Sequence, residues 1–119
     1  MLFRSMSLLH DQGIRFEVRS VFLQGLLLTP PPILKEKLHD IYSQILFLTQ
    51  FANELNEDLI SLCLNYAKKI YWNSGTIISA ANISQLDEIL NHRTFDFHIE
   101  QFPTLPEDYL DPRIWKFKL

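Results

Sequence analysis

The residue types that most often carry chemistry are few in this chain and widely spaced. Cys63 is the single cysteine of the 119 residues, which excludes an internal disulfide and a multi-cysteine metal site. Because Leu62 and Leu64 flank Cys63, we expect a small buried thiol rather than a reactive one. His98 and Glu100 have an alternating spacing that could suit a metal, but two ligands without a third make a poor site. We therefore predict no metal centre.

The composition is that of an ordinary soluble domain, with 47% hydrophobic and 21% charged residues. The net charge is -3 and the Lys and Arg residues are scattered, so a basic face for nucleic acid is not expected. No stretch approaches the roughly 20 apolar residues of a membrane span. The N-terminus lacks the pattern of a signal peptide, so the expected location is cytoplasmic.

The beginning of the chain is expected to form a helix and then a strand. Apolar residues at helical spacing predict a helix over residues 2–11, and Gly13 stands where a C-cap glycine belongs. Residues 14–20 alternate between apolar and charged side chains, which predicts a strand that runs on into the apolar residues 21–28. Residues 30–32 are three prolines, which end this element because each lacks a backbone N–H and has a fixed φ.

Two helices are expected next. One helical face is indicated by the spacing of Leu34, Leu38, Ile41, Ile45 and Leu48. Asn56 is predicted to be the N-cap of the second helix, with Glu57 and Asp58 in its first turn and Lys68 and Lys69 near its C-terminal end. The buried stripe of this helix is expected to comprise Leu59, Leu62, Cys63, Tyr66 and Ile70.

The last part of the chain is expected to contain a second strand, a third helix and a tail. Residues 73–75 predict a turn, and residues 76–80 predict a short buried strand. A capping box begins the following helix, formed by Asn82 with Gln85 or by Ser84 with Asp87. The apolar side of this helix is predicted to be Leu86, Ile89 and Leu90. From residue 95 onward, aromatic residues and prolines indicate an ordered, extended tail.

Strands that alternate with helices favour an α/β fold with parallel strands and crossover helices. Two parallel strands alone leave two open edges and cannot close a barrel. We therefore interpret the chain as one partial domain over residues 1–119, with βα units in 1–94 and the tail in 95–119.

Three segments resemble the C-terminal part of aldo/keto reductases, especially bacterial members associated with surface-polysaccharide biosynthesis. Residues 13–28, with the run Arg-Ser-Val-Phe-Leu-Gln-Gly-Leu, are similar to the seventh-strand region of that family. Residues 77–90 resemble the eighth strand and the following helix, and residues 110–115 resemble the tail. The resemblance implies the last two strands of a (β/α)₈ TIM barrel with their surrounding helices.

Members of that family transfer a hydride between NADP(H) and a carbonyl, using an Asp, a Tyr, a Lys and a His on earlier strands. Those strands are not in this sequence, so the resemblance implies no catalytic residue here. None of the tyrosines and histidines falls in a catalytic context of the family, and these are Tyr42, Tyr66, Tyr71, Tyr109, His10, His39, His92 and His98.

Cofactor contacts are implied at two places. In the family, the loop after the seventh strand holds the cofactor pyrophosphate, which the resemblance maps onto Ser20, Phe22, Gln24 and Gly25. The helix after the eighth strand holds the adenosine phosphate, which maps onto Ser79, Asn82, Gln85 and Glu88. The alternative interpretation is structural, with Ser20 at a buried strand end and with Asn82, Ser84 and Gln85 as helix caps.

The choice between NADP and NAD stays open, because no Lys or Arg lies between Lys69 and Arg93 to hold a 2′-phosphate. The leading hypothesis is a C-terminal portion of a reductase that is inactive alone. The alternatives are a small α/β interaction module that forms a homo-oligomer, and one part of a split barrel whose N-terminal partner supplies the other strands.

Overall fold

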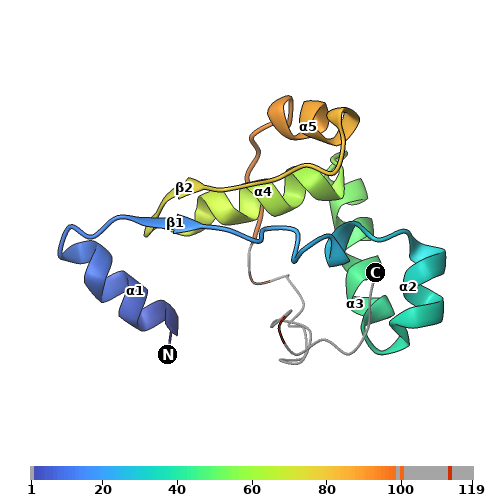
Figure 1. Ribbon diagram of the computed structural model, residues 1–119, viewed down its shortest axis with the longest axis horizontal. Coiled ribbons are helices and arrows are strands. Elements are labelled where there is room, and N and C mark those ends of the chain that lie inside the picture. Colours follow the sequence, from blue (N-terminus) through green and yellow to red (C-terminus); the bar gives the residue numbers. More distant parts are fainter. Residues whose placement is uncertain (1, 99, 101–112, 114–119) are drawn as a thin grey trace.

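The fold is a mixed α/β arrangement that is mostly helical (Figure 1). The computed structural model describes residues 2–98, 100 and 113. Along this part of the chain the elements are α1 (Leu2–Asp11), β1 (Phe16–Val18), the 3₁₀ helix η1 (Leu26–Leu28), α2 (Pro31–Lys37), α3 (His39–Glu54), α4 (Leu59–Lys69), β2 (Asn73–Thr76) and α5 (Ile83–Leu90). The predicted helix at 2–11 is confirmed, as is the parallel pairing of the two strands.

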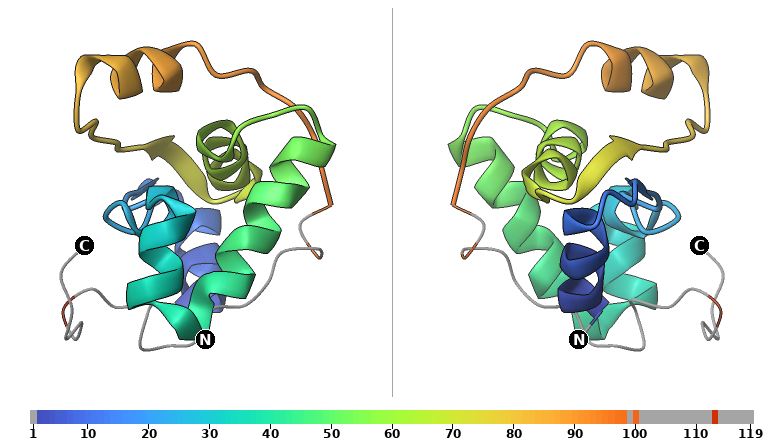
Figure 2. Two further views of the ribbon diagram at one scale, coloured as in Figure 1. Left: turned by 90° about the vertical axis from the view of Figure 1, so that its right-hand side faces the viewer. Right: turned by 90° about the vertical axis from the view of Figure 1, so that its left-hand side faces the viewer.

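Helix α4 forms the centre of the molecule. It contacts β2, α3, α5 and η1, and Figure 2 shows it nearly end-on with α3 and α5 on different sides. The predicted stripe is right for Leu62 and Cys63, but burial extends around the helix to Ser61, Leu64 and Ala67. A helix that is buried nearly all round is the core of a domain rather than its surface.

The apolar face predicted between residues 34 and 48 is confirmed, but the single helix is wrong. All five of its residues are buried, yet the chain forms two helices, α2 and α3, that pack on each other. Leu38 lies between them with φ −132° and ψ 47°, and its N–H still donates to the Leu34 carbonyl. Because Leu38 is only 2% exposed, burial of this side chain stabilises the bend.

The predicted strand at residues 14–20 is shorter in the structure, and its continuation through residue 28 is wrong. Strand β1 ends at Val18, and Ser20 has a φ of +60°, which no strand residue adopts. Turns and η1 follow in place of extended chain. The buried residues of the core form three clusters, which include Ile60, Ile45 and Leu48 respectively. Half-buried Leu27 in η1 packs against all three clusters, which a straight strand would not allow. Pro31 and Pro32 then occupy the first turn of α2, where their missing N–H groups cost no hydrogen bond.

The N-terminal cap of α4 is Asp58 rather than the predicted Asn56. The Asp58 carboxylate accepts a hydrogen bond from the Ser61 N–H at 2.7 Å. Asn56 lies in the preceding turn with a φ of +55°, a conformation that Asn tolerates better than most residues. Both residues are favoured caps, so the sequence pattern alone did not distinguish them.

The predicted turn at residues 73–75 is wrong, because these residues belong to β2. The Asn73 side chain explains the difference, since it accepts hydrogen bonds from the N–H groups of Val18 and Gly75 and donates to the Ala67 carbonyl. One amide therefore connects β1, β2 and the end of α4. The pairing of β1 with β2 is irregular here, with Phe16 opposite Asn73 and Glu17 opposite Gly75.

Helix α5 begins with the Asn82–Gln85 capping box, one of the two predicted. The Asn82 side chain accepts from the Gln85 N–H at 2.8 Å, and the Gln85 side chain accepts from the Ala81 N–H at 2.7 Å. The predicted apolar side is only partly right. Ile89 is buried, whereas Leu86 and Leu90 are exposed.

The segment after α5 is attached to the centre of the molecule by the buried amide of Asn65. This side chain donates to the Ser61 and Arg93 carbonyls, both at 2.8 Å, and accepts from the Phe95 N–H at 3.2 Å. Two residues further, the Phe97 ring is buried and packs edge-on against the Phe51 ring. Residues 93–97 thus lie against the core. Of the rest of the predicted tail, only residues 98, 100 and 113 belong to the described residues, so the resemblance at 110–115 lies outside them apart from Arg113.

No helix in the described part of the chain is long and apolar enough to cross a membrane.

We predict that Asn65→Leu lowers the free energy of unfolding by about 2–4 kcal/mol, because it leaves the Arg93 carbonyl and the Phe95 N–H without their partner. Urea unfolding followed by circular dichroism measures the change. Asn91→Leu is the matched control, since the Asn91 amide is exposed and, among the described residues, bonds only to Asp87. A loss below about 0.5 kcal/mol for Asn65→Leu, within the range of ordinary surface substitutions, would contradict the assigned role.

Candidate functional site

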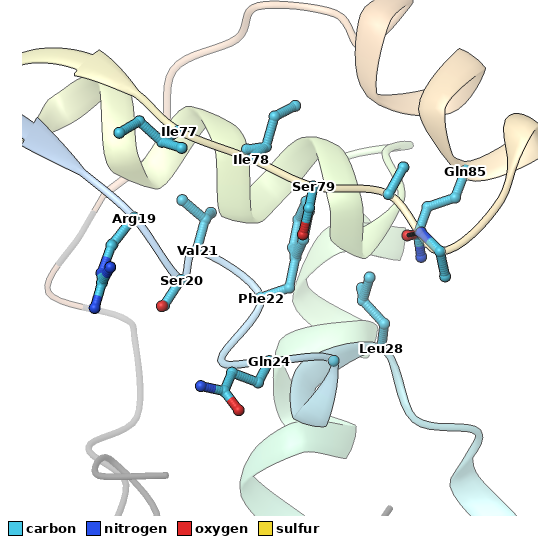
Figure 3. A pocket seen from close by; sticks show the side chains of 13 residues that line it. Arg19, Ser20, Val21, Phe22, Gln24, Leu28, Ile77, Ile78, Ser79 and Gln85 are labelled. Carbon is cyan, nitrogen blue, oxygen red and sulfur yellow. Dashed lines mark hydrogen bonds between the residues drawn. The ribbon is translucent and has the colours of Figure 1, made fainter. Parts of the chain in front are cut away.

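A cavity of about 580 Å³ lies between two segments that are far apart in the sequence. One wall comprises residues 19–28, which follow β1, and the other comprises residues 77–85, which follow β2 and begin α5. Figure 3 shows these walls facing each other across the cavity. The parallel pairing of β1 with β2 brings them together, because the carboxyl ends of parallel strands meet at the same edge of a sheet.

Six of the eight residues expected to contact a cofactor line this cavity. These are Ser20, Phe22, Gln24, Gly25, Ser79 and Gln85. The other two, Asn82 and Glu88, are exposed and are not among the lining residues. The Asn82 side chain caps α5, which is the alternative structural role expected for it.

The backbone of the first wall adopts an unusual conformation. Ser20, Leu23 and Gln24 have φ values of +60°, +51° and +53°, and Gly25 follows with +88°. For a non-glycine residue the left-handed region costs roughly 1–2 kcal/mol. Such strain is concentrated at functional sites more often than elsewhere in proteins. Gly25 is the one residue of this group that adopts the conformation without a steric cost.

Backbone amides supply hydrogen-bond donors at this wall. The N–H groups of Val21, Phe22 and Gln24 donate to no acceptor among the described residues. The Leu23 N–H between them donates to the Ser20 carbonyl. Unpaired amides in a turn that contains left-handed residues can donate to an anion. This arrangement can bind an anionic or strongly polar group, but it provides no acid–base pair.

The side chains give the cavity a mixed character. Val21 and Leu28 extend toward residues 77–81, whereas Arg19 and Ser20 extend to the opposite side (Figure 3). Val21, Phe22, Ile78 and Ala80 belong to the same hydrophobic cluster, which also includes Ile60 and Cys63 of α4.

The sequence interpretation missed the one ionisable residue of the lining, Arg19. The alternation of apolar and charged residues in 14–20 includes Arg19, but this pattern predicts a strand and does not indicate a ligand-binding side chain. Arg19 follows β1 directly and is exposed, so its charge lies at the rim of the cavity. The apolar lining residues Leu28, Ile77 and Ile78 were also missed as cavity residues.

Cys63 is buried, as predicted, and lies in α4. Burial raises the pKa of its thiol to about 12, and the nearby Asp58 carboxylate adds to this effect. A thiol that stays protonated is a poor nucleophile, so Cys63 acts here as a packing residue.

His98 and Glu100, the alternating pair considered for a metal, are both exposed. Across the described residues, no group of three His, Cys, Asp or Glu side chains could hold a metal ion.

No protein-family model, no curated protein and no solved structure matches this chain.

We predict that Gly25→Ala lowers the free energy of unfolding by about 1–2 kcal/mol. A Cβ at Gly25 would meet nothing within 4 Å, so the cost comes from the φ of +88° alone. Gly75→Ala is the matched control, because Gly75 has no positive φ and its Cβ would make only an ordinary contact with Glu17 at 3.7 Å. Thermal and urea unfolding measure both variants. Equal stability of the two would contradict the left-handed conformation at Gly25.

We predict that the stability of the protein falls as the pH rises from about 9 toward 12. In this window the unfolded chain loses the Cys63 proton at its ordinary pKa of 9.0, while the folded chain keeps it. The unfolded state then binds fewer protons, so the free energy of unfolding decreases by up to about 1.4 kcal/mol for each pH unit. Urea unfolding of the native protein and of Cys63→Ala between pH 8 and 10.5 isolates the effect. An identical slope in both would contradict it.

Proposed function

We propose that this chain is the C-terminal portion of a (β/α)₈ barrel similar to the NAD(P)H-dependent aldo/keto reductases. In this proposal it contributes the phosphate-binding end of the cofactor site, lacks the catalytic residues and is inactive as an oxidoreductase by itself. The cofactor supplies the hydride when bound. The residues of this chain hold and orient its phosphate end.

The observation that carries the proposal is the meeting of two distant segments. The family resemblance requires residues near 20–25 and residues near 79–85 to surround one ligand, and both segments line a single cavity. Further support comes from the topology, since β1, the helices α2 to α4, and β2 form a strand–helix–parallel strand unit.

The cavity fits part of a dinucleotide rather than all of it. The free N–H groups of Val21, Phe22 and Gln24 and the open backbone at Gly25 suit phosphate oxygens. Arg19 is the one cation in the lining, and it extends away from the second wall. This donor set favours binding through backbone amides and gives no preference for the 2′-phosphate of NADP over NAD.

A second candidate function is an interaction module, either a homo-oligomer or half of a split barrel with an N-terminal partner. Within the described residues each strand pairs only with the other, so each keeps one unpaired edge. Apolar side chains are exposed nearby, with Ile77 at 54%, Leu90 at 71% and Ile83 at 86%. Unpaired edges beside exposed apolar residues favour association.

We predict that the purified chain binds NADPH and NADH weakly and saturably, and that it reduces no aldehyde by itself. Titration of cofactor fluorescence, with sizing chromatography of the same sample, measures affinity and association together. Ser79→Asp places a negative charge in the cavity and is expected to weaken binding by at least about tenfold, corresponding to about 1.4 kcal/mol.

The matched control is Ser74→Asp, at an exposed position of β2 that does not line the cavity. Saturable binding that Ser79→Asp weakens and Ser74→Asp leaves unchanged would support the cofactor site. Absence of binding by a folded monomer would contradict it. Concentration-dependent size without cofactor binding would favour the interaction module.

A further inference from the structure

A second, smaller cavity of about 290 Å³ lies next to the first. It is lined by residues 27–31, by α2 and α3, by the start of α4 and by Gln85 of α5, and it is open to solvent on one side. Its walls include Leu34 and Ile45, which are almost completely buried, and the buried Ile60. The cavity is therefore set into the packed part of the molecule rather than into a loop.

The wall of this second cavity is more apolar than its residue types suggest. Thr29 and Thr49 both line it, but each directs its hydroxyl to its own backbone. The Thr29 hydroxyl donates to the Gly25 carbonyl at 3.0 Å, and the Thr49 hydroxyl donates to the Ile45 carbonyl at 3.1 Å. None of the described lining residues carries a charge at neutral pH. A charged ligand group would lose its hydration here without gaining a partner, at a cost of several kcal/mol.

Gln85 is the polar residue at the boundary of the two cavities. Together with Leu28 it lines both of them, and its side chain extends from α5 toward Leu28 (Figure 3). Its amide oxygen is used by the Ala81 N–H, which fixes the orientation of the side chain. Its amide nitrogen donates to no acceptor among the described residues. The second cavity thus combines a mainly apolar interior with the oriented Gln85 amide at its edge and the Tyr42 phenol in its wall.

We propose that this second cavity binds a neutral, mainly apolar small molecule, consisting of a medium-length alkyl chain with one acceptor oxygen. The chain fills the space between α2, α3 and α4, and the oxygen accepts a hydrogen bond from the Gln85 amide nitrogen. The uncharged lining selects a neutral group over a carboxylate. This site adjoins the proposed cofactor site and shares the lining residues Leu28 and Gln85 with it, and its test uses no nucleotide.

The probe is 2-octanone, with octanoate at neutral pH as its charged counterpart of equal chain length. Titration of the ¹⁵N-labelled protein, followed by the side-chain amide signals of Gln85 and the backbone signals of Thr49 and Leu59, measures binding at the site itself. We expect saturable shifts of these signals with 2-octanone and at least tenfold weaker binding of octanoate.

Two variants test separately how the Gln85 hydrogen-bond donor and the cavity volume contribute to the affinity for 2-octanone. Gln85→Glu keeps the oxygen that caps α5 and replaces the donating nitrogen with an oxygen, so the affinity for 2-octanone is expected to fall by about tenfold. Thr49→Leu fills part of the cavity with a residue that favours helices, and it is expected to weaken binding by a similar factor. Gln50→Leu, at the exposed neighbouring position of α3, is the control and should bind within twofold of the native protein.

Three results would overturn the proposal. The first is the absence of saturable shifts in the native protein, whose fold the same spectra report. The second is octanoate binding as tightly as 2-octanone. The third is equal affinity of the native protein, Gln85→Glu and Thr49→Leu, which would locate the ligand elsewhere.

Discussion

The structure depends on the burial of α4. Six consecutive residues, 60–65, are buried in this helix together with Ala67, so almost no side of it faces water. A helix of this kind is stable only when other elements cover it, and here α3, α5, β2 and η1 do so. Asn65 has the one side-chain amide in this buried stretch. This amide donates to the Arg93 carbonyl and accepts from the Phe95 N–H, which attaches residues 93 and 95 to α4. The segment that follows α5 is therefore attached directly to α4.

The first cavity is a consequence of this packing. Its two walls do not bind each other through a dense set of polar contacts. Instead, Phe22 of one wall and Ile78 of the other both pack against the cluster that contains Ile60 and Cys63. The strained backbone at residues 20–25 is tolerated because Phe22 within this segment and Leu26 directly after it are buried in the core. The geometry of the candidate site and the stability of the core are thus set by the same contacts.

The sequence predicted burial patterns better than element boundaries. Hydrophobic periodicity correctly identified the face that includes Leu34 and Leu48, because spacing alone determines which side chains share a face. It did not reveal the bend at Leu38, which preserves that face while changing the direction of the helix axis. It also misplaced the second strand, because Asn73 and Gly75 are turn residues by local preference, and the distant partners of the Asn73 amide outweigh that preference.

The candidate site was predictable only in part for the same reason. The segments that form it could be chosen from the resemblance, whereas the positive φ values of Leu23 and Gln24 have no signature in residues of these types. The second cavity arises from five separate elements, and its polar character depends in part on where two threonine hydroxyls point. No single segment of the sequence contains that information.

The parallel pairing of Phe16 with Asn73 also fixes an order of events during synthesis. Strand β1 leaves the ribosome long before β2 exists, and at about 5–20 residues per second it waits several seconds for its partner. Helices α2, α3 and α4 lie between them and are joined by short connections, so they can pack while β1 remains unpaired. Arg15, Glu17 and Arg19 place a charge at every second position of the waiting segment. These charges disfavour pairing of the nascent β1 segment with another chain before β2 has been synthesised.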